Sequence, residues 1–472
     1  MASEDPDITS DASLMQRYAK EARAGSSALN NLTYEERQKI LRTVAKALQA
    51  NEARILSANH EDMTAAKENA VAAPLLKRLE LTPSKLATLV EGISTLADMA
   101  DPIGQILAAR ELDNNLLLIK QTASIGVVLI VFESRPDSLP QIAALALCTG
   151  NGLLLKGGRE AERSNAVLHD VIVSAVESST QGRVPRGVIG LVTNRADVYS
   201  LLQMDEYIDL VVPRGSNAMV QDIQRSTRIP VLGHADGICH VYVHEDADVD
   251  AALAVAIDSK LNYPAACNTA ETLLLHHRLL QRPAHGTTAA QFLVEGMKQA
   301  GVSFYGGPKA IAAGLVSQPA ASFHMEYGDA RMAVEVVDDL AAAITHVNRH
   351  GSHHTDTILT TDKAAAAEFQ RRIESACVFH NCSTRFADGY RFGLGAEVGI
   401  STARIHARGP VGAEGLLTQK WVLKPIVLSS EVTGEDAPYA TVTEFQNGQR
   451  SFTHRDVTRK LQDEAARSQF PA

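Results

Sequence analysis

The sequence predicts an α/β fold built on mostly parallel, doubly wound sheets. Uninterrupted apolar runs, such as Gly126–Phe132 and Leu153–Leu155, are typical of strands buried on both faces. Stretches with helical spacing of apolar residues separate such runs, among them Leu139–Cys148 and Glu160–Glu177. Alternating strands and helices favour a parallel sheet covered by helices. A second unit of this kind is expected to begin after Asp250.

The region before the first strand is expected to be helical. Thr33 followed by Glu36 forms a capping-box pattern, which marks a helix start. The apolar spacing predicts helices at Leu14–Leu29, Tyr34–Asn51, Ala53–Asn69 and Pro83–Met99. Together they would cover one face of the first sheet.

Further elements follow along the chain. The alternating stretch Leu112–Ser124 predicts an edge strand or one arm of a hairpin. More strands are expected at Val188–Val192, Leu210–Val212, Ile229–Leu232, Cys239–Val243, Thr272–Leu275, Val334–Val337 and Trp421–Leu423, and more helices at Ala251–Lys260, Ala289–Ala300 and Ala341–Arg349. Beyond Ser429 the chain is polar, with a short exposed helix expected at Val457–Ser468.

Composition limits the class of protein. The 472 residues carry a formal net charge of −10, which argues against a nucleic-acid groove because basic patches dominate such binding. No apolar run approaches the roughly 20 residues that span a bilayer, and the acidic N-terminus lacks a secretory signal pattern. The five cysteines are scattered, which favours a reducing compartment. We therefore expect a cytoplasmic protein.

Cys267 is the leading candidate for a catalytic nucleophile. Pro264 breaks the preceding helix, so the cysteine should lie on a tight loop. The small residues Ala265–Ala266 leave the sulfur approachable, and Asn262 and Asn268 offer amide donors. A thiol among such donors suits attack on an acyl carbon. The alternative is that Cys267 merely fills a buried space.

Three polar turns follow predicted strands: Arg135, Lys156–Arg159 and Gly215–Ser216. Strand ends of this kind meet at the ligand-binding edge of a doubly wound sheet. Gly-rich turns that open a helix present N–H groups to phosphate, and Lys156 and Arg159 add positive charge. A dinucleotide with an extra ribose phosphate would fit. The alternative is that each turn is an ordinary connection, since no G-x-G-x-x-G fingerprint is present.

We expect no metal site. His346, His350, His353 and His354 lie close in the sequence, but carboxylate partners are poorly arranged. A polar loop lining a phosphate or substrate pocket is favoured there. Cys377, His380 and Cys382 resemble half of a zinc site, and the matching half is missing.

A set of separate stretches points to one family. These are Phe132–Asp137, Lys156–Gly158, Tyr263–Asn268, Thr345–Ile358 and Phe392–Thr402. Residues 14–428 resemble the γ-glutamyl phosphate reductases, which belong to the aldehyde dehydrogenase superfamily. The histidine-rich stretch is particular to this family rather than to the superfamily.

The resemblance implies an aldehyde dehydrogenase-like fold with two doubly wound parallel-sheet domains and a β oligomerisation arm. The expected parts are a helical layer and the start of the cofactor domain (1–108), the arm (109–124), the NADP-binding domain (125–248), the catalytic domain (249–414), the closing strand of the arm (415–428) and a polar tail (429–472).

The resemblance also implies an activity. L-Glutamyl 5-phosphate would be reduced by NADPH to L-glutamate 5-semialdehyde and phosphate, the second step of proline biosynthesis. Cys267 matches the family's nucleophile, which would form a thioester. Asn262 is a candidate for the oxyanion hole. Candidates for the substrate phosphate are Arg135, whose guanidinium matches phosphate oxygens, and His350 and His353.

NADPH or NADP is the expected cofactor. Lys156 matches the lysine that holds the adenosine ribose, and Glu326 resembles the glutamate that reaches the nicotinamide ribose. The remaining candidates for the cofactor site are Gly157, Arg159, Gly215 and Ser216. Preference for NADPH over NADH rests on Lys156, Arg159 and the resemblance.

One departure from the superfamily concerns water activation. Hydrolytic aldehyde dehydrogenases carry a glutamate base before their cysteine, and the corresponding segment here is His234–Gly237. Loss of that base suits a thioester that must accept hydride rather than water. Two rival interpretations remain open: an enzyme that uses coenzyme A as leaving group, and a non-enzymatic protein that keeps the fold.

The expected partners are the small-molecule substrate, a glutamate 5-kinase that channels it, and further copies of the chain in a homodimer or larger homo-oligomer. No amino-acid kinase domain precedes the region of resemblance, so the chain does not look like the bifunctional pyrroline-5-carboxylate synthase.

Overall fold

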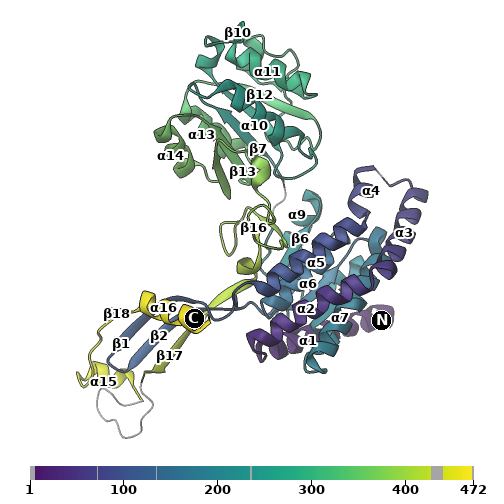
Figure 1. Cartoon of the computed structure of the whole chain (residues 1–472), viewed down its shortest axis with the longest axis vertical. Helices are drawn as coiled ribbons and strands as arrows, with labels where there is room; N and C mark the ends of the chain where they lie inside the picture. The colour runs from purple at the N-terminus through teal and green to yellow at the C-terminus, as the bar shows by residue number, and fades with distance from the viewer. Residues whose placement is uncertain (1–5, 72, 134, 234–235, 427–438, 470–472) are drawn as a thin grey trace, which may run out of the picture.

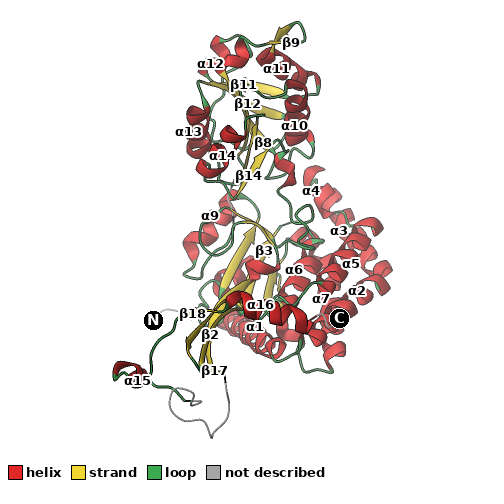
Figure 2. Ribbon diagram, turned by 60° about the vertical axis from the view of Figure 1, so that its left-hand side comes forward, coloured by secondary structure: helices red, strands yellow, loops and turns green. Residues whose placement is uncertain are grey.

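The computed structural model describes residues 6–71, 73–133, 135–233, 236–426 and 439–469. This part of the chain forms two α/β lobes and a β-sheet arm (Figures 1 and 2). The N-terminal helices and the first parallel sheet make one lobe, and the second parallel sheet makes the other. The predicted doubly wound α/β fold is confirmed.

The first sheet is parallel, in the order β5-β4-β3-β6. Its strands are β3 (Val127–Phe132), β4 (Gly152–Lys156), β5 (Ile189–Val192) and β6 (Leu210–Arg214). Every residue of β3 is buried, as its apolar run predicted. On one face lie α1 (Pro6–Asn30), α8 (Arg195–Leu201) and α9 (Asn217–Ser226). On the other lie α2 (Tyr34–Ala50), α3 (Glu52–Glu68), α5 (Pro83–Asp98), α6 (Ser138–Cys148) and α7 (Glu162–Thr180), with α4 (Ala73–Leu79) beside α3.

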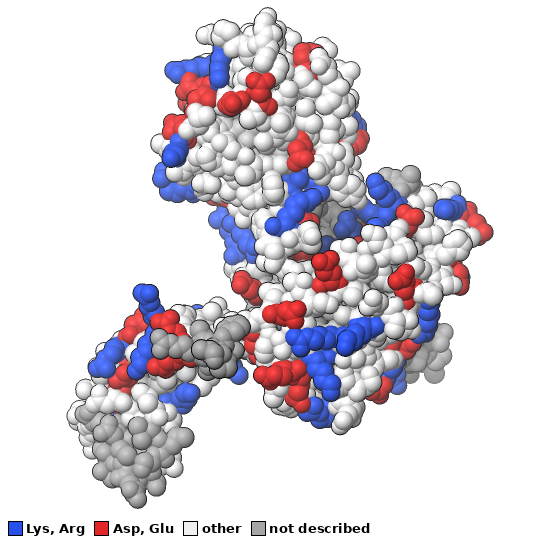
Figure 3. Space-filling model, viewed as in Figure 1, with Lys and Arg blue, Asp and Glu red and all other residues white. Residues whose placement is uncertain are grey.

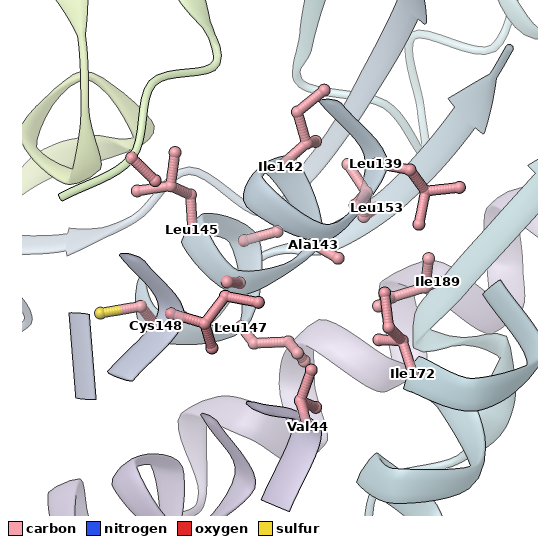
Figure 4. Packing of buried hydrophobic residues seen from close by; sticks show 14 of the residues in the cluster. Val44, Leu139, Ile142, Ala143, Leu145, Leu147, Cys148, Leu153, Ile172 and Ile189 are labelled. Carbon is pink, nitrogen blue, oxygen red and sulfur yellow. The ribbon is translucent and has the colours of Figure 1, made fainter. Parts of the chain in front are cut away.

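The core of this lobe is shown in Figure 4. Leu139 and Ile142 of α6 are fully buried with Leu153 of β4 and Ile172 of α7. Shortening one such side chain to alanine costs about 2–5 kcal/mol in a close-packed core. This close-packed core therefore holds the strands in place, and with them the turns that follow the strand ends.

The second sheet is also parallel, in the order β11-β12-β8-β7-β13-β14. Its strands are β7 (Cys239–Val243), β8 (Ala270–His276), β11 (Ser303–Gly306), β12 (Arg331–Val337), β13 (Thr355–Leu359) and β14 (Cys377–His380). α10 (Val249–Leu261), α11 (Ala289–Gln299) and α12 (Pro308–Ala312) pack on one face. α13 (Leu340–His350) and α14 (Lys363–Arg372) pack on the other. The short pair β9 (Pro283–Ala284) and β10 (Thr287–Thr288) precedes α11.

The arm is an antiparallel sheet in the order β17-β2-β1-β18. Its strands are β1 (Ile106–Asp113), β2 (Leu116–Ser124), β17 (Leu417–Pro425) and β18 (Arg455–Asp456). α16 (Thr458–Gln469), the expected tail helix, packs on the arm through Leu461. α15 (Val442–Gln446) precedes β18, and the pair β15 (Gly399–Ser401) and β16 (Gly409–Val411) precedes β17.

Several expected boundaries were wrong. β7 pairs with β8 and β13 of the second sheet, although residues 125–248 were assigned to the first domain. The arm begins at Ile106 rather than at residue 109, and the tail supplies β18. The expected strand Ile229–Leu232 makes a single bridge, between Val211 and Val231. Each error has one cause: strand partners are chosen by tertiary hydrogen bonding, which local pattern does not encode.

Candidate active site

Cys267 lies on the loop between α10 and β8. α10 ends at Leu261, ahead of Pro264, which cannot donate a helical hydrogen bond. Tyr263 turns the chain with φ of 70°, a conformation that bulky residues rarely adopt. The Ala266 N–H donates to the Tyr263 carbonyl at 3.1 Å. The predicted tight loop is confirmed, and Cys267 is partly exposed on it.

Arg135, Arg214 and Arg385 line the same cavity as Cys267, which measures about 200 Å³. Arg214 ends β6 of the first lobe, whereas Cys267 and Arg385 belong to the second. Lys and Arg side chains gather around the hollow between the lobes (Figure 3). The cavity therefore brings cationic groups from both lobes to the thiol.

Glu397 also lines this cavity, and its carboxylate faces Arg214. Their closest atoms, Oε1 and Nη2, are 3.8 Å apart. The Gly389 N–H donates to Glu397 Oε2 at 2.7 Å. Burial raises the pKa of Glu397 and lowers the pKa of Arg214 and of Arg385. Guanidinium groups so poorly solvated interact strongly with an anionic ligand.

A larger cavity of about 360 Å³ adjoins the first. The two share Arg135, Arg214, Asp388 and Glu397. α5 and the first turn of α6 form its opposite wall, including Ser138. A substrate with its reactive carbon at Cys267 has room to extend here.

The structure does not bring the Asn262 side chain to the thiol. Its Nδ2 donates to Asp258 Oδ1 at 2.9 Å, one helical turn earlier, and the residue is exposed. The Asn262 carbonyl accepts from Arg385 Nε at 2.5 Å. The expectation of an oxyanion-hole donor at Asn262 is corrected, because a local helical partner takes the amide. Asn268 lines the cavity instead, and its Nδ2 donates to the Ala387 carbonyl at 2.9 Å.

A separate cavity of about 470 Å³ surrounds Lys156 on the first lobe. Its apolar wall includes Val198 and Met219, and Ser216 lies at the start of α9. Gly215 lines the Cys267 cavity next door. Gly157 and Arg159 line a smaller depression of about 20 Å³ beside it. Apart from Glu326, the residues expected to bind a cofactor thus lie along one edge of the first sheet.

Glu326 lies on the second lobe and is exposed. The segment around it is held at both ends. Phe323 packs edge-on against His346, with ring centroids 4.6 Å apart. The Gly328 N–H donates to Glu271 Oε1 at 3.2 Å. A cofactor held by both Lys156 and Glu326 would bridge the two lobes.

His350 and His353 are not brought to Cys267. His350 packs against Phe323 and His346, and the His353 carbonyl accepts from the Ala376 N–H at 2.9 Å. Among the described residues that line the Cys267 cavity, none comes from this histidine stretch. The expected phosphate role of His350 and His353 is corrected, because His350 ends α13 and packs against Phe323, while the His353 backbone is bonded to Ala376.

Metal-ligand geometry occurs elsewhere in the described residues, where His244, Glu245 and His276 offer atoms within 4.8 Å of one another. The Arg278 N–H donates to His276 Nδ1 at 3.2 Å, and Arg278 also pairs with Glu245. Because His276 Nδ1 and the Glu245 carboxylate already accept hydrogen bonds from Arg278, we assign no metal to these three residues. It lies at the far end of β8 from Cys267.

Sequence analysis missed Arg214, Arg385 and Glu397. Arg214 directly precedes the Gly215 turn at a strand end, so its position was a usable signal. Glu397 lies in the stretch Phe392–Thr402, which was used only for the family resemblance. Nothing local marks Arg385. His234, at the position of the missing base, lies outside the described residues, but Gly237 of the same segment packs on the Cys267 backbone.

The family profile described as "Aldehyde dehydrogenase family" matches residues 8–292. The chain belongs to the aldehyde dehydrogenase family. Within the family it is 43% identical over 451 residues to gamma-glutamyl phosphate reductase of Trichormus variabilis, covering 94% of this chain and 98% of that protein. This similarity places the chain, within the family, among the relatives of the γ-glutamyl phosphate reductases.

A second relative is longer. The chain is 54% identical over 403 residues to Delta-1-pyrroline-5-carboxylate synthase 1 of Oryza sativa subsp. japonica, covering 85% of this chain. It spans about half the length of such relatives, 55% in this case.

A solved aldehyde dehydrogenase-family structure agrees with the fold. The crystal structure of gamma-glutamyl phosphate reductase from Thermotoga maritima has a TM-score of 0.82 and 32% identity, with 89% of this chain and 99% of that one covered. Within the described residues, no helix combines the length and apolarity needed to cross a lipid bilayer.

Proposed function

We propose that this protein reduces L-glutamyl 5-phosphate to L-glutamate 5-semialdehyde and phosphate with NADPH. The observation that carries the proposal is the cavity that places Cys267 among Arg135, Arg214 and Arg385, next to the Lys156 cavity. An acyl phosphate brings the anionic leaving group that guanidinium groups bind. The relative named gamma-glutamyl phosphate reductase supports this substrate class.

In the proposed reaction the Cys267 thiolate attacks the acyl carbon. The carbon–sulfur bond forms, the bond from carbon to the phosphate oxygen breaks, and phosphate leaves. Nearby positive charge favours the thiolate. We propose Arg135 as the principal phosphate ligand, with Arg385 on the opposite lobe completing the clamp.

In the next step the thioester must be reduced by hydride transfer and must not be hydrolysed by water. The segment 236–237 beside Cys267 contains no glutamate, and its Asp236 accepts a hydrogen bond from Asn217. We propose that the loss of this glutamate keeps water from being activated at the thioester. NADPH, when bound, supplies the hydride that reduces the thioester carbon. The resulting oxyanion expels the Cys267 thiolate and leaves the aldehyde.

The Lys156 cavity fits a phosphorylated dinucleotide. Its apolar wall suits a base, and the Lys156 ammonium suits ribose hydroxyls. Ser216, the N-cap of α9, makes no side-chain cap among the described contacts, so helix N–H groups can face a pyrophosphate. Arg159 is exposed beside Gly157, and its charge favours the extra phosphate of NADPH.

The arm is proposed to join copies of the chain into a homo-oligomer. Trp421 and Leu423 on its edge strand β17 are 58% and 54% exposed, and an unpaired edge invites another chain. We also propose that a glutamate 5-kinase supplies the unstable acyl phosphate, in the cytoplasm.

The test is the reverse reaction. NADP reduction should require both glutamate semialdehyde and phosphate. Cys267→Ala should lower turnover by more than about 10³-fold while NADPH still binds. Cys382→Ala is the matched control, because Cys382 is an exposed free cysteine outside the site, and it should keep full activity.

Two results would count against the proposal. Activity with coenzyme A in place of phosphate would support the rival acyl-CoA chemistry. Turnover by Cys267→Ala at the native rate would show that Cys267 is not the nucleophile.

A further inference from the structure

We propose that Glu397 and Arg214 form the receptor for the amino-acid head of the substrate. Glu397 binds the α-ammonium group and Arg214 binds the α-carboxylate. The inference rests on the proposed function, in which the substrate is a glutamyl phosphate. It identifies the residues that select an α-amino acid over a simple acyl phosphate.

The geometry of the pair fits a zwitterion. Oε1 of Glu397 and Nη2 of Arg214 are 3.8 Å apart, which is beyond hydrogen-bond length. Their side chains are only 17% and 21% exposed. A buried carboxylate and guanidinium that do not satisfy each other gain from a ligand that carries the complementary charges on one carbon.

The pair lies where the substrate's tail must go. Both residues line the Cys267 cavity and also the larger cavity beside it. The glutamyl group has a short aliphatic chain between its acyl carbon and its α-carbon. With the acyl carbon at Cys267, the charged head would reach the boundary between the two cavities.

Other carboxylates at the larger cavity fit the role less well. Asp388 Oδ1 accepts the N–H groups of Tyr390 and Arg391 at 3.0 and 3.2 Å. Glu91 is exposed on α5. Asp137 lines the larger cavity but not the one with Cys267. Glu397 is the less exposed of the two carboxylates that line both cavities, at 17% against 41% for Asp388.

Close backbone contacts fix the pair. A Cβ added at Gly389 would lie 2.7 Å from Glu397 Cβ, and one added at Gly399 would lie 3.1 Å from Arg214 Nε. Glycine at both positions lets the backbone approach these side chains. The pair is thus approached by the glycine-rich stretch that runs from Gly389 to Gly399, the first residue of β15.

The test compares two aldehydes in the phosphate-dependent reduction of NADP. Glutamate semialdehyde carries the α-ammonium, and 5-oxopentanoate lacks it. Glu397→Gln should lower kcat/KM for glutamate semialdehyde by about 30-fold or more, and for 5-oxopentanoate by less than about twofold. Glu68→Gln, which changes an exposed carboxylate at the end of α3 that lines neither cavity, should change neither value. Each variant is checked by its melting midpoint and by alkylation of Cys267.

A second measurement needs no variant. With the wild-type enzyme, L-glutamate should compete with glutamate semialdehyde at a concentration about tenfold lower than glutarate does. Equal losses for both aldehydes in Glu397→Gln, no loss for either, or equal inhibition by L-glutamate and glutarate would overturn the receptor. Wild-type enzyme that shows no phosphate-dependent reaction with glutamate semialdehyde would instead overturn the proposed function itself.

Discussion

A buried ion pair closes the loop that carries Cys267, and its removal should both destabilise the second lobe and disturb the nucleophile. Lys260 Nζ and Glu271 Oε2 are 2.6 Å apart, and both side chains are 0% exposed. Lys260 lies in the last turn of α10 and Glu271 lies in β8, so the pair links the two flanks of the loop. We predict that Lys260→Met breaks this link.

The magnitude follows from the burial. Loss of one partner of a buried ion pair costs about 3–5 kcal/mol, because the remaining charge is uncompensated. Burial already raises the pKa of Glu271 to about 7 even with the attraction of Lys260. Without the lysine the carboxyl protonates at neutral pH, which limits the penalty, so the lower end of that range is expected. Lys260→Met/Glu271→Gln carries no buried charge, and its amide oxygen can still accept from Gly328, so most of the loss should be recovered.

The assay is urea unfolding at pH 7.5, together with the rate of Cys267 alkylation. Lys309→Met is the control, since Lys309 pairs with Asp338 at the surface, where the side chains are 53% and 69% exposed, and should change stability by less than about 1 kcal/mol. A cost below about 1 kcal/mol for Lys260→Met, or a double variant no more stable than the single one, would refute the reasoning.

Two further predictions concern Gly237 and His346. A Cβ at Gly237 would lie 2.2 Å from the Cys267 carbonyl oxygen, so Gly237→Ala should displace the nucleophile and lower turnover more than about tenfold; native turnover would contradict the contact. Burial lowers the pKa of His346 to about 3, so between pH 6.5 and 3 the unfolded chain binds a proton that the folded chain does not, and stability is lost as pH falls. At pH 5.5 this loss of folding free energy is about 1.4 kcal/mol. His346→Phe should lack this loss when the urea midpoints at pH 7.5 and 5.5 are compared. Equal losses in the native protein and in the variant would refute the role of His346.

Much of the architecture could be predicted because the signals are local. The buried strands β3 and β4 are uninterrupted apolar runs, and α2 begins at the Thr33 capping box as expected. The loop that carries Cys267 followed from Pro264, which breaks the helix before it. The histidine stretch was misassigned for the opposite reason. Its residues are polar and close in sequence, but His350 ends α13 and packs against Phe323, and no residue of the stretch lines the described cavity of Cys267.

The sequence by itself determined the fold class and the family and singled out Cys267 as the candidate nucleophile, because each of these inferences depends on short local stretches of the chain. Only the tertiary structure decided which charges surround that cysteine. Arg135, Arg214 and Arg385 come from separate elements of two lobes, and Asn262, a near neighbour in sequence, bonds to Asp258 instead. Electrostatic energy depends on distance in space and on burial, and neither is a property of a local stretch of sequence.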